Sequence, residues 1–261
     1  MNQKLWQNYE RFAASRGAMV AQILSQRLDL RGACILDFGA GTGGVSLELA
    51  RRGAIVTAIE PNPQKRAILI EQKGDLPLCV VEAISNEQFD AVILSDVIEH
   101  LIGRCAWLKC FHEHLSPGGF VYLSTPNKGS PVNMLCDPHF SLPLISLLNR
   151  RWVKWITADV LRWQPKERID FPQLLSLREL YEGARAAGYQ LQLINREAAA
   201  FALQHPQALW NRALHLHIID LCRRIGAERL LIRLISDEID FFNERVNPSW
   251  YALLIKKACR E

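Results

Sequence analysis

Closely spaced glycines and two acidic residues between Ile35 and Pro61 have the pattern of a cofactor-binding turn. ILDFGAGTGG, Ile35 to Gly44, places an apolar run before the glycines, and a second apolar run ends on Glu60. Glycine lets backbone approach a ligand closely because it has no Cβ, and a helix that begins there directs unpaired N–H groups at the ligand. Glu60 follows the first glycine by about 20 residues, where a carboxylate can accept from both hydroxyls of a ribose. We therefore predict a site for a nucleoside-containing cofactor.

Two glycine patterns overlap in this turn. Gly39, Gly41 and Gly44 satisfy G-x-G-x-x-G, the dinucleotide pattern. Gly39, Gly41 and Gly43, with Asp37 ahead of them, satisfy D-x-G-x-G-x-G. The glycines alone do not choose between the two. Asp37 favours the second pattern, because a carboxylate would repel a pyrophosphate but would attract a cationic, amino-acid-bearing ligand.

Composition and charge restrict the class of protein. The chain has 261 residues, of which 49% are hydrophobic and 22% charged, as in an ordinary globular domain with insertions. A net charge of +4 gives no tract for nucleic acid. No signal-peptide core and no membrane-spanning apolar run is evident, so we expect a cytoplasmic protein. The seven cysteines lack C-x-x-C spacing and the histidines lack ligand spacing, so the sequence predicts reduced cysteines and no metal site.

Strand-like and helix-like segments alternate from residue 30 to 125, which indicates a βαβ sheet. The expected strands in this part are 34–38, 54–60, 77–83, 89–96 and 119–125, and the expected helices are 3–28, 44–52, 63–72 and 101–115. The alternation fails over residues 128–172. Ser176 and Glu179 then form a capping box that predicts a helix to Gly188. A sixth strand is expected at 189–197, helices at 198–246 and a seventh strand at 249–258.

Four motifs, in this order, resemble those of class I S-adenosylmethionine-dependent methyltransferases: LDFGAGTG, AIEPN, FDAVILSDVIEHL and LSPGGFVYLSTPN. The third is similar to that of the quinone-biosynthesis-like, small-molecule subgroup. The resemblance implies an α/β, Rossmann-like, seven-stranded doubly wound sheet. In it strands 1–6 are parallel, strand 7 is antiparallel, and helical insertions follow strand 5 and separate strands 6 and 7. It also implies one domain over residues 1–261. Its parts are an N-terminal helix at 1–28, a cofactor-binding half at 30–127, a substrate lid at 128–172 and a helical insertion at 198–246.

The same resemblance implies S-adenosyl-L-methionine as the cofactor. Asp37 would hold its amino group, Glu60 its ribose hydroxyls and Glu82 its exocyclic adenine amine, with Ser95 and Asp96 near the methionyl and sulfonium groups. The implied cofactor-binding residues are Asp37, Gly39, Ala40, Gly41, Gly43, Glu60, Pro61, Asn62, Glu82, Ala83, Ser95 and Asp96.

Methyl transfer needs a general base only when the acceptor must lose a proton, as a hydroxyl does. His139, in CDPHFSLP, is the candidate catalytic base, because the ordinary pKa of histidine suits proton removal near neutrality. A structural histidine in an irregular loop is the alternative interpretation. We expect His100 to pack at the edge of the sheet.

Residues 142–163 mix aromatic and basic side chains. Trp152, Trp155 and Trp163 alternate with arginines and a lysine beside an apolar run. Such a segment can touch a membrane peripherally, with rings at headgroup depth and cations on anionic lipid. It can also stack sugars or bases, or form a packed lid with solvated arginines.

The leading hypothesis is therefore a methyltransferase that acts on a small or lipophilic acceptor, at oxygen, and not on nucleic acid. One alternative is a non-catalytic S-adenosylmethionine-binding or scaffold protein. Another is a methyltransferase that acts on protein or nucleic acid, against which SDVIEH stands where many amino-directed enzymes carry N/D-P-P-[YF]. A nicotinamide oxidoreductase is the third alternative.

Overall fold

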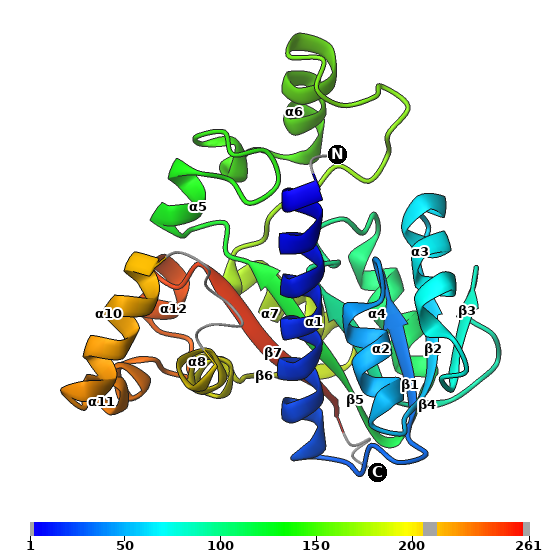
Figure 1. Ribbon diagram of the computed structural model, residues 1–261. Helices are drawn as coiled ribbons and strands as arrows, with labels where there is room; N and C mark the ends of the chain where they lie inside the picture. Colours follow the sequence, from blue (N-terminus) through cyan, green and yellow to red (C-terminus); the bar gives the residue numbers. More distant parts are fainter. Residues whose placement is uncertain (1–2, 206–212, 258–261) are drawn as a thin grey trace. The chain divides into compact units, whose positions relative to one another are not determined.

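The computed structural model describes residues 3–205 and 213–257, which contain a seven-stranded sheet (Figure 1). Its strand order is β3-β2-β1-β4-β5-β7-β6. The strands are β1 (Cys34–Phe38), β2 (Ile55–Ile59), β3 (Leu78–Val81), β4 (Phe89–Ser95), β5 (Leu115–Pro126), β6 (Tyr189–Leu193) and β7 (Ser249–Lys256). β1 pairs in parallel with β2 and β4, β2 pairs in parallel with β3, and β7 runs antiparallel to β6. The predicted Rossmann-like, seven-stranded fold is confirmed.

Helices surround these strands in the chain order expected for a doubly wound fold. The α-helices are α1 (Gln3–Ser25), α2 (Gly44–Arg51), α3 (Pro63–Lys73), α4 (Arg104–Glu113), α5 (Pro131–Leu135), α6 (Arg150–Lys154), α7 (Leu177–Ala186), α8 (Asn195–Gln204), α10 (Ala213–Arg224), α11 (Ala227–Leu234) and α12 (Phe241–Arg245). A 3-10 helix, η1 (Ile145–Leu147), precedes α6, and a π-helix, η2 (Trp155–Val160), follows it. No helix among these combines the length and the apolar character that crossing a membrane requires.

The chain forms two compact units. Unit 1 comprises residues 1–93, 114–120 and 194–235, and unit 2 comprises residues 94–113, 121–193 and 236–261.

In unit 1, α1 packs directly on the beginning of α2. A Cβ at Gly17 would lie 2.1 Å from the carbonyl oxygen of Gly44, and a Cβ at Gly44 would lie 2.4 Å from the backbone of Ala13. Only glycine permits this approach, because real Cβ atoms do not come so close to backbone. The N-terminal helix is thereby fixed against the helix that starts at the glycine turn.

In unit 2, α7 and α4 are anchored to the antiparallel pair β6 and β7. The capping box predicted at Ser176 and Glu179 is present and begins α7 at Leu177. Tyr189 on β6 donates a hydrogen bond from its hydroxyl to the carbonyl oxygen of Leu108 on α4, at 3.1 Å. Trp250 on β7 is fully buried. These contacts give unit 2 a core of its own.

Several element boundaries differ from the sequence-based expectation, among them the beginning of β5 and the end of β6. β5 begins at Leu115, before the strand expected at 119–125 and at the last residue of the helix expected at 101–115, and Gly118 within it has a φ of +81°. The sixth strand, predicted to reach residue 197, ends at Leu193, and α8 begins at Asn195. That prediction was wrong at its end because Glu197 stands in the first turn of the helix, where an acid is favourable, and three alanines follow. Of the helices expected at 198–246, residues 206–212 lie outside the described part.

Candidate functional site

The glycine turn between β1 and α2 is held in a conformation that suits glycine. Gly39, Gly41 and Gly43 have φ values of 82°, 61° and 91°. The amides of Gly39 and Ala40 both donate to the carbonyl oxygen of Ile59, at 2.8 and 3.0 Å, which ties the turn to the end of β2. A Cβ at Gly43 would lie 2.2 Å from a methyl carbon of Leu69. The turn is therefore rigid backbone built within unit 1.

Glu60 holds this turn from the end of β2. Its carboxylate is buried; Oε2 accepts from the amide of Gly41 and Oε1 accepts from the amide of Asn62, each at 2.7 Å. A carboxylate offers about four lone-pair positions, so both oxygens can still accept from ribose hydroxyls. Glu60 is thus placed to orient the glycine turn and a ligand together.

Asp37 is buried two residues before the turn. Ser46, on α2, donates from its hydroxyl to Oδ2 of Asp37 at 2.5 Å. The pKa of Asp37 is raised to about 6, chiefly by burial and also by the charge of Glu60, while the hydrogen bonds from Ser46 oppose the rise. A ligand ammonium beside Asp37 would stabilise the ionised carboxylate. Ser46 was not among the predicted site residues.

Two of the predicted adenine-side residues of unit 1, Asn62 and Glu82, have protein partners. Asn62 caps α3, with its Oδ1 accepting from the amides of Gln64 and Lys65 at 3.0 Å. The side chain of Glu82 is 82% exposed and lies 3.3 Å from the guanidinium of Arg66. Pro61 and Ala83 are exposed.

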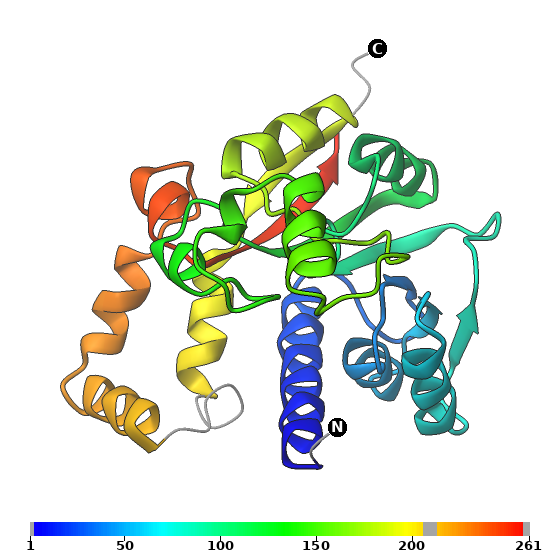
Figure 2. The ribbon, with the colours of Figure 1, turned by 90° about the horizontal axis from the view of Figure 1, so that it is seen from above.

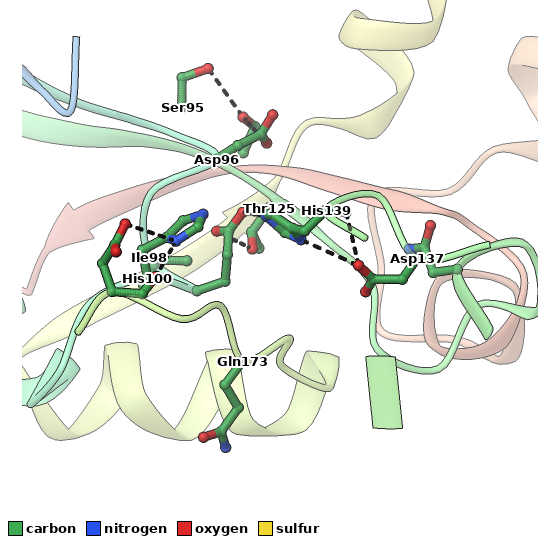
Figure 3. A network of polar contacts seen from close by, with 12 residues as sticks. Ser95, Asp96, Ile98, His100, Thr125, Asp137, His139 and Gln173 are labelled. Atoms are coloured by element: carbon green, nitrogen blue, oxygen red, sulfur yellow. Dashed lines mark hydrogen bonds and ion pairs between the residues drawn. The ribbon is translucent and has the colours of Figure 1, made fainter. Parts of the chain in front are cut away.

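Ser95 is the last residue of β4, and Asp96 follows it, both in unit 2 (Figure 3). Asp96 has a φ of 55°, which is uncommon for a residue other than glycine. Ser124 donates from its hydroxyl to Oδ1 of Asp96 at 3.0 Å, and the Ser95 and Ser124 hydroxyls lie 3.4 Å apart. Such strained backbone collects at functional sites.

A buried carboxylate, Glu99, and the imidazole of His139 lie close together in unit 2. Glu99 is fully buried, and its Oε2 accepts from the hydroxyl of Thr125 at 3.0 Å. Its Oε1 has no hydrogen-bond partner among the described residues and lies 3.7 Å from Nε2 of His139. That distance is too long for a hydrogen bond. A buried, half-paired carboxylate is costly, and such groups are characteristic of functional sites.

Asp137 organises the loop that carries His139. Its buried Oδ1 accepts from the amides of His139 and Phe140, at 2.8 and 2.9 Å, and lies 3.9 Å from Nδ1 of His139 (Figure 3). The imidazole of His139 therefore has one carboxylate near each of its nitrogens.

His100 is the third member of this cluster. Its ring stands edge-on to that of His139, with centroids 5.0 Å apart, and its Nδ1 donates to the carbonyl oxygen of Asp170 at 2.8 Å. Burial lowers the pKa of His100, an effect that the negative charge of Glu99 opposes. Donor atoms of Glu99, His100 and His139 lie within 4.8 Å of one another. One carboxylate and two imidazoles suit a divalent cation such as zinc, so these residues could hold one.

The glycine turn, buried acids and histidine cluster stand on a chain whose residues 6–194 match a family model described as a methyltransferase domain. The chain belongs to this methyltransferase family.

Similar proteins extend this result. The ubiquinone biosynthesis O-methyltransferase of Methylocella silvestris is 31% identical over 166 residues, 60% of this chain and 58% of that protein. The protein of the same name from Cereibacter sphaeroides is 30% identical over 186 residues, 68% of each. An S-adenosylmethionine-dependent methyltransferase structure from Mesorhizobium loti has a TM-score of 0.57, with 14% identity over 90% of this chain and 96% of that one. That structure supports the fold.

These findings confirm the predicted class I methyltransferase family, an enzyme that uses S-adenosylmethionine. The family match ends at Ile194, so the helices from Asn195 onward lie outside it.

Within this methyltransferase domain, His139 was predicted from the sequence as the base, whereas Glu99 was given no role and His100 was expected at the edge of the sheet. Both residues stand in SDVIEHL, directly after β4. The carboxyl end of a parallel strand is where ligands bind in such folds, and this position is the signal that could have identified them. Spacing along the chain could not show that His139 meets them.

Proposed function

We propose that this chain transfers a methyl group from S-adenosylmethionine to a hydroxyl oxygen of a small or lipophilic acceptor. The observation that carries the proposal is the half-paired Glu99 carboxylate facing His139 in a methyltransferase domain. The names of the relatives, O-methyltransferases at 30–31% identity, support oxygen as the atom that is methylated. They favour a small molecule over a macromolecule, and an enzyme over a scaffold.

The methyl donor is proposed to be bound chiefly by acidic side chains of unit 1. Asp37 binds the amino group of the methionyl part, Glu60 binds the ribose hydroxyls, and Glu82 accepts from adenine after leaving Arg66. The turn geometry and the burial of the two acids support these roles. The proposed cofactor set remains Asp37, Gly39, Ala40, Gly41, Gly43, Glu60, Pro61, Asn62, Glu82, Ala83, Ser95 and Asp96.

Unit 2 is proposed to receive the acceptor hydroxyl. His139 takes the hydroxyl proton on Nε2 while the oxygen attacks the methyl carbon, and the carbon–sulfur bond breaks to leave the neutral thioether S-adenosylhomocysteine. The buried carboxylate of Glu99, 3.7 Å away, stabilises the imidazolium that forms. No redox partner is needed, because the sulfonium supplies the electrophile and accepts the electron pair.

A cation-assisted form of the same reaction is the second candidate. The three donor atoms within 4.8 Å favour it, and so does the unpaired Oε1 of Glu99. A divalent cation bound by Glu99, His100 and His139 would act as a Lewis acid that lowers the pKa of a coordinated hydroxyl. Dialysis against a chelator distinguishes the two forms: lost transfer that returns with zinc or magnesium supports the cation, and unchanged transfer supports the base.

We also propose peripheral membrane contact through residues 142–163. Trp152, Trp155 and Trp163 are 52, 50 and 54% exposed, which a packed lid does not explain. A lipophilic acceptor dissolved in a membrane would be reached from such a surface.

The function is tested in two stages. Calorimetric titration with S-adenosylhomocysteine, with NAD as the control ligand, should give heat only with the former. Transfer of labelled methyl groups to cell extract, fractionated into lipid, small-molecule, protein and nucleic-acid pools, should then label lipids or small molecules. Label confined to protein or nucleic acid would contradict the proposed acceptor, and no heat with S-adenosylhomocysteine would contradict the proposed donor.

A further inference from the structure

The helix that carries the exposed tryptophans begins with a residue bonded to the backbone of the Glu99 cluster. α6 and η2 form one continuous helical segment (Figures 1 and 2). Its first residue, Arg150, donates from guanidinium Nη2 to the carbonyl oxygens of Glu99 and Leu101, at 2.9 and 3.0 Å. A single guanidinium therefore donates hydrogen bonds to the carbonyls at both ends of the turn Glu99–Leu101.

The chain that returns from this helix bonds to the same turn. The amide of Gln173 donates to the carbonyl oxygen of Glu99 at 2.9 Å, and Oε1 of Gln173 accepts from the amide of Arg150 at 3.2 Å. The carbonyl of Asp170 accepts from His100. We call Arg150 and Gln173, with the carbonyls of Glu99 and Leu101, the clamp. Both ends of segment 150–173 thus meet at residues of the proposed site.

The outer face of this segment combines exposed rings with cations. Segment 150–173 contains six cationic and three acidic side chains, and two of the cations, Lys166 and Arg168, are paired with Asp159 and Asp170. The rings of Trp152 and Trp155, one helical turn apart, stand edge-to-face with centroids 5.6 Å apart. We call the exposed residues of 150–168 the outer face; they are Arg151, Trp152, Trp155, Asp159, Val160, Leu161, Arg162, Trp163, Pro165, Lys166 and Glu167. Interfacial tryptophans beside arginine and lysine are the chemistry of an anionic lipid surface.

The inner face of the same segment packs beside His139. Val153 and Ala158 are buried with Ile145 and Phe171, and Phe140, the residue after His139, packs against this cluster. Displacement of the segment therefore acts on the site from two directions, through the clamp and through Phe140. Close-packed side chains transmit such displacements because they leave few voids to absorb them.

We propose that an anionic lipid surface binds the outer face of segment 150–173 and, through the clamp, holds Glu99 and His100 in their working positions. The proposal rests on the proposed function for what that site does. A lipid surface can shift the site only if it binds the clamped arrangement more tightly than others. We expect tighter binding to the clamped arrangement because the clamp holds in place the helix that carries tryptophans and cations on its surface. By linkage, a weakened clamp must then lose its response to lipid.

The test measures binding and amide exchange, neither of which needs methyl transfer. The full chain is floated with vesicles of phosphatidylcholine alone or with phosphatidylglycerol added. We expect flotation on the order of tenfold greater with the anionic vesicles, since each cation near the surface adds attraction. Hydrogen exchange is then followed at the amides of His100, Leu101 and Gln173, which are hydrogen-bonded in the turn and clamp. Anionic vesicles should slow their exchange several-fold.

Three variants separate the surface from the clamp. Trp152→Ser with Trp155→Ser should lose flotation and leave exchange in the free protein unchanged. Arg150→Lys keeps the charge but loses the hydrogen bonds to two carbonyls, so flotation should weaken without being lost, while the lipid-induced protection of His100, Leu101 and Gln173 disappears. Arg151→Lys, the same change at the next and exposed position, should behave as the natural protein.

Several results of these experiments would overturn the proposal. Equal flotation on neutral and anionic vesicles, or none, would overturn the lipid surface. Flotation without slower exchange at the turn would overturn the coupling, as would a response to lipid in Arg150→Lys equal to that in Arg151→Lys. Protection of the same amides by single-stranded RNA, with no flotation, would assign the face to nucleic acid and overturn the proposal. Because exchange is measured without an acceptor, failure of methyl transfer would contradict the proposed function and leave this result standing.

Discussion

The glycine turn of unit 1 and the Glu99 cluster of unit 2 both contain buried carboxylates, but they differ in how fully these are hydrogen-bonded. In the turn, each oxygen of the Glu60 carboxylate accepts from a backbone amide, and Asp37 accepts from Ser46. In the cluster, Oε1 of Glu99 and Nδ1 of His139 are buried without a hydrogen-bond partner among the described residues. Carboxylates whose oxygens are both hydrogen-bonded hold the backbone of the turn rigidly. A buried carboxylate with one oxygen left without a hydrogen bond can still bind a proton or a cation. The difference supports the proposal that the glycine turn binds the cofactor and that the Glu99 cluster carries the base.

The largest effect is expected when the proposed base of the Glu99 cluster is removed. Replacing His139 with alanine should lower methyl transfer by about 10²–10⁴-fold, the usual contribution of a general base, because Nε2 is lost. Affinity for S-adenosylhomocysteine, measured by calorimetry, should not change. His217→Ala, at an exposed position on α10, serves as the control. Unimpaired transfer by His139→Ala would remove the base.

The rigid side is tested at Gly43. Gly43→Ala combines a φ of 91° with a Cβ only 2.2 Å from Leu69, so we expect a loss of about 2–4 kcal/mol of unfolding free energy. Affinity for S-adenosylhomocysteine should fall by tenfold or more, because the start of α2 must shift. Gly32→Ala is the matched control: its φ is 75° but no atom lies within 4 Å of the added Cβ. It should lose only the backbone cost, about 1–2 kcal/mol. Equal losses in denaturant titrations would show that the contact with Leu69 is unimportant.

The two regions also differ in how far sequence could predict them. The turn is local: Asp37, the glycines and Glu60 lie within one βαβ unit, so spacing along the chain approximates distance in space. The cluster joins residues 99, 100 and 139 with the carbonyl of Asp170, and no periodicity records that meeting. The same reasoning explains the strands. The succession of strands along the chain followed from a recognisable pattern. The end of β6 depended on whether residues 194–197 continue the strand or begin a helix. The hydrogen bond of the clamp between Arg150 and the carbonyl of Glu99 could likewise not be predicted from the sequence.

The pKa of Asp37 provides a prediction that depends on pH. Burial raises this pKa to about 6, whereas the unfolded chain has a value near 3.8. Between these values the folded chain binds more protons than the unfolded chain, so stability falls as pH rises through this range. A ligand ammonium favours the ionised carboxylate. Affinity for S-adenosylhomocysteine should therefore weaken by about tenfold per pH unit below 6. Calorimetry over this range tests the slope, and Asp37→Asn should give weak binding that does not vary with pH. An equal slope in that variant would assign the effect to another group.

The smallest effect is expected at Glu82, and it sharpens the comparison because it tests where the rigid cradle ends. Glu82 is 82% exposed and pairs with Arg66 at 3.3 Å, a contact that contributes at most about 1 kcal/mol in water. Glu82→Gln keeps an oxygen that can accept from the adenine amine, so affinity for S-adenosylhomocysteine should fall less than about threefold, with no measurable change in unfolding. Glu60→Gln offers the same chemical change at a buried position and should lower affinity at least tenfold, because its replaced oxygen can no longer accept from a backbone amide. A large loss at Glu82 would instead extend the cradle to the end of β3, since a mobile surface acid cannot supply such a contribution unless the ligand buries it.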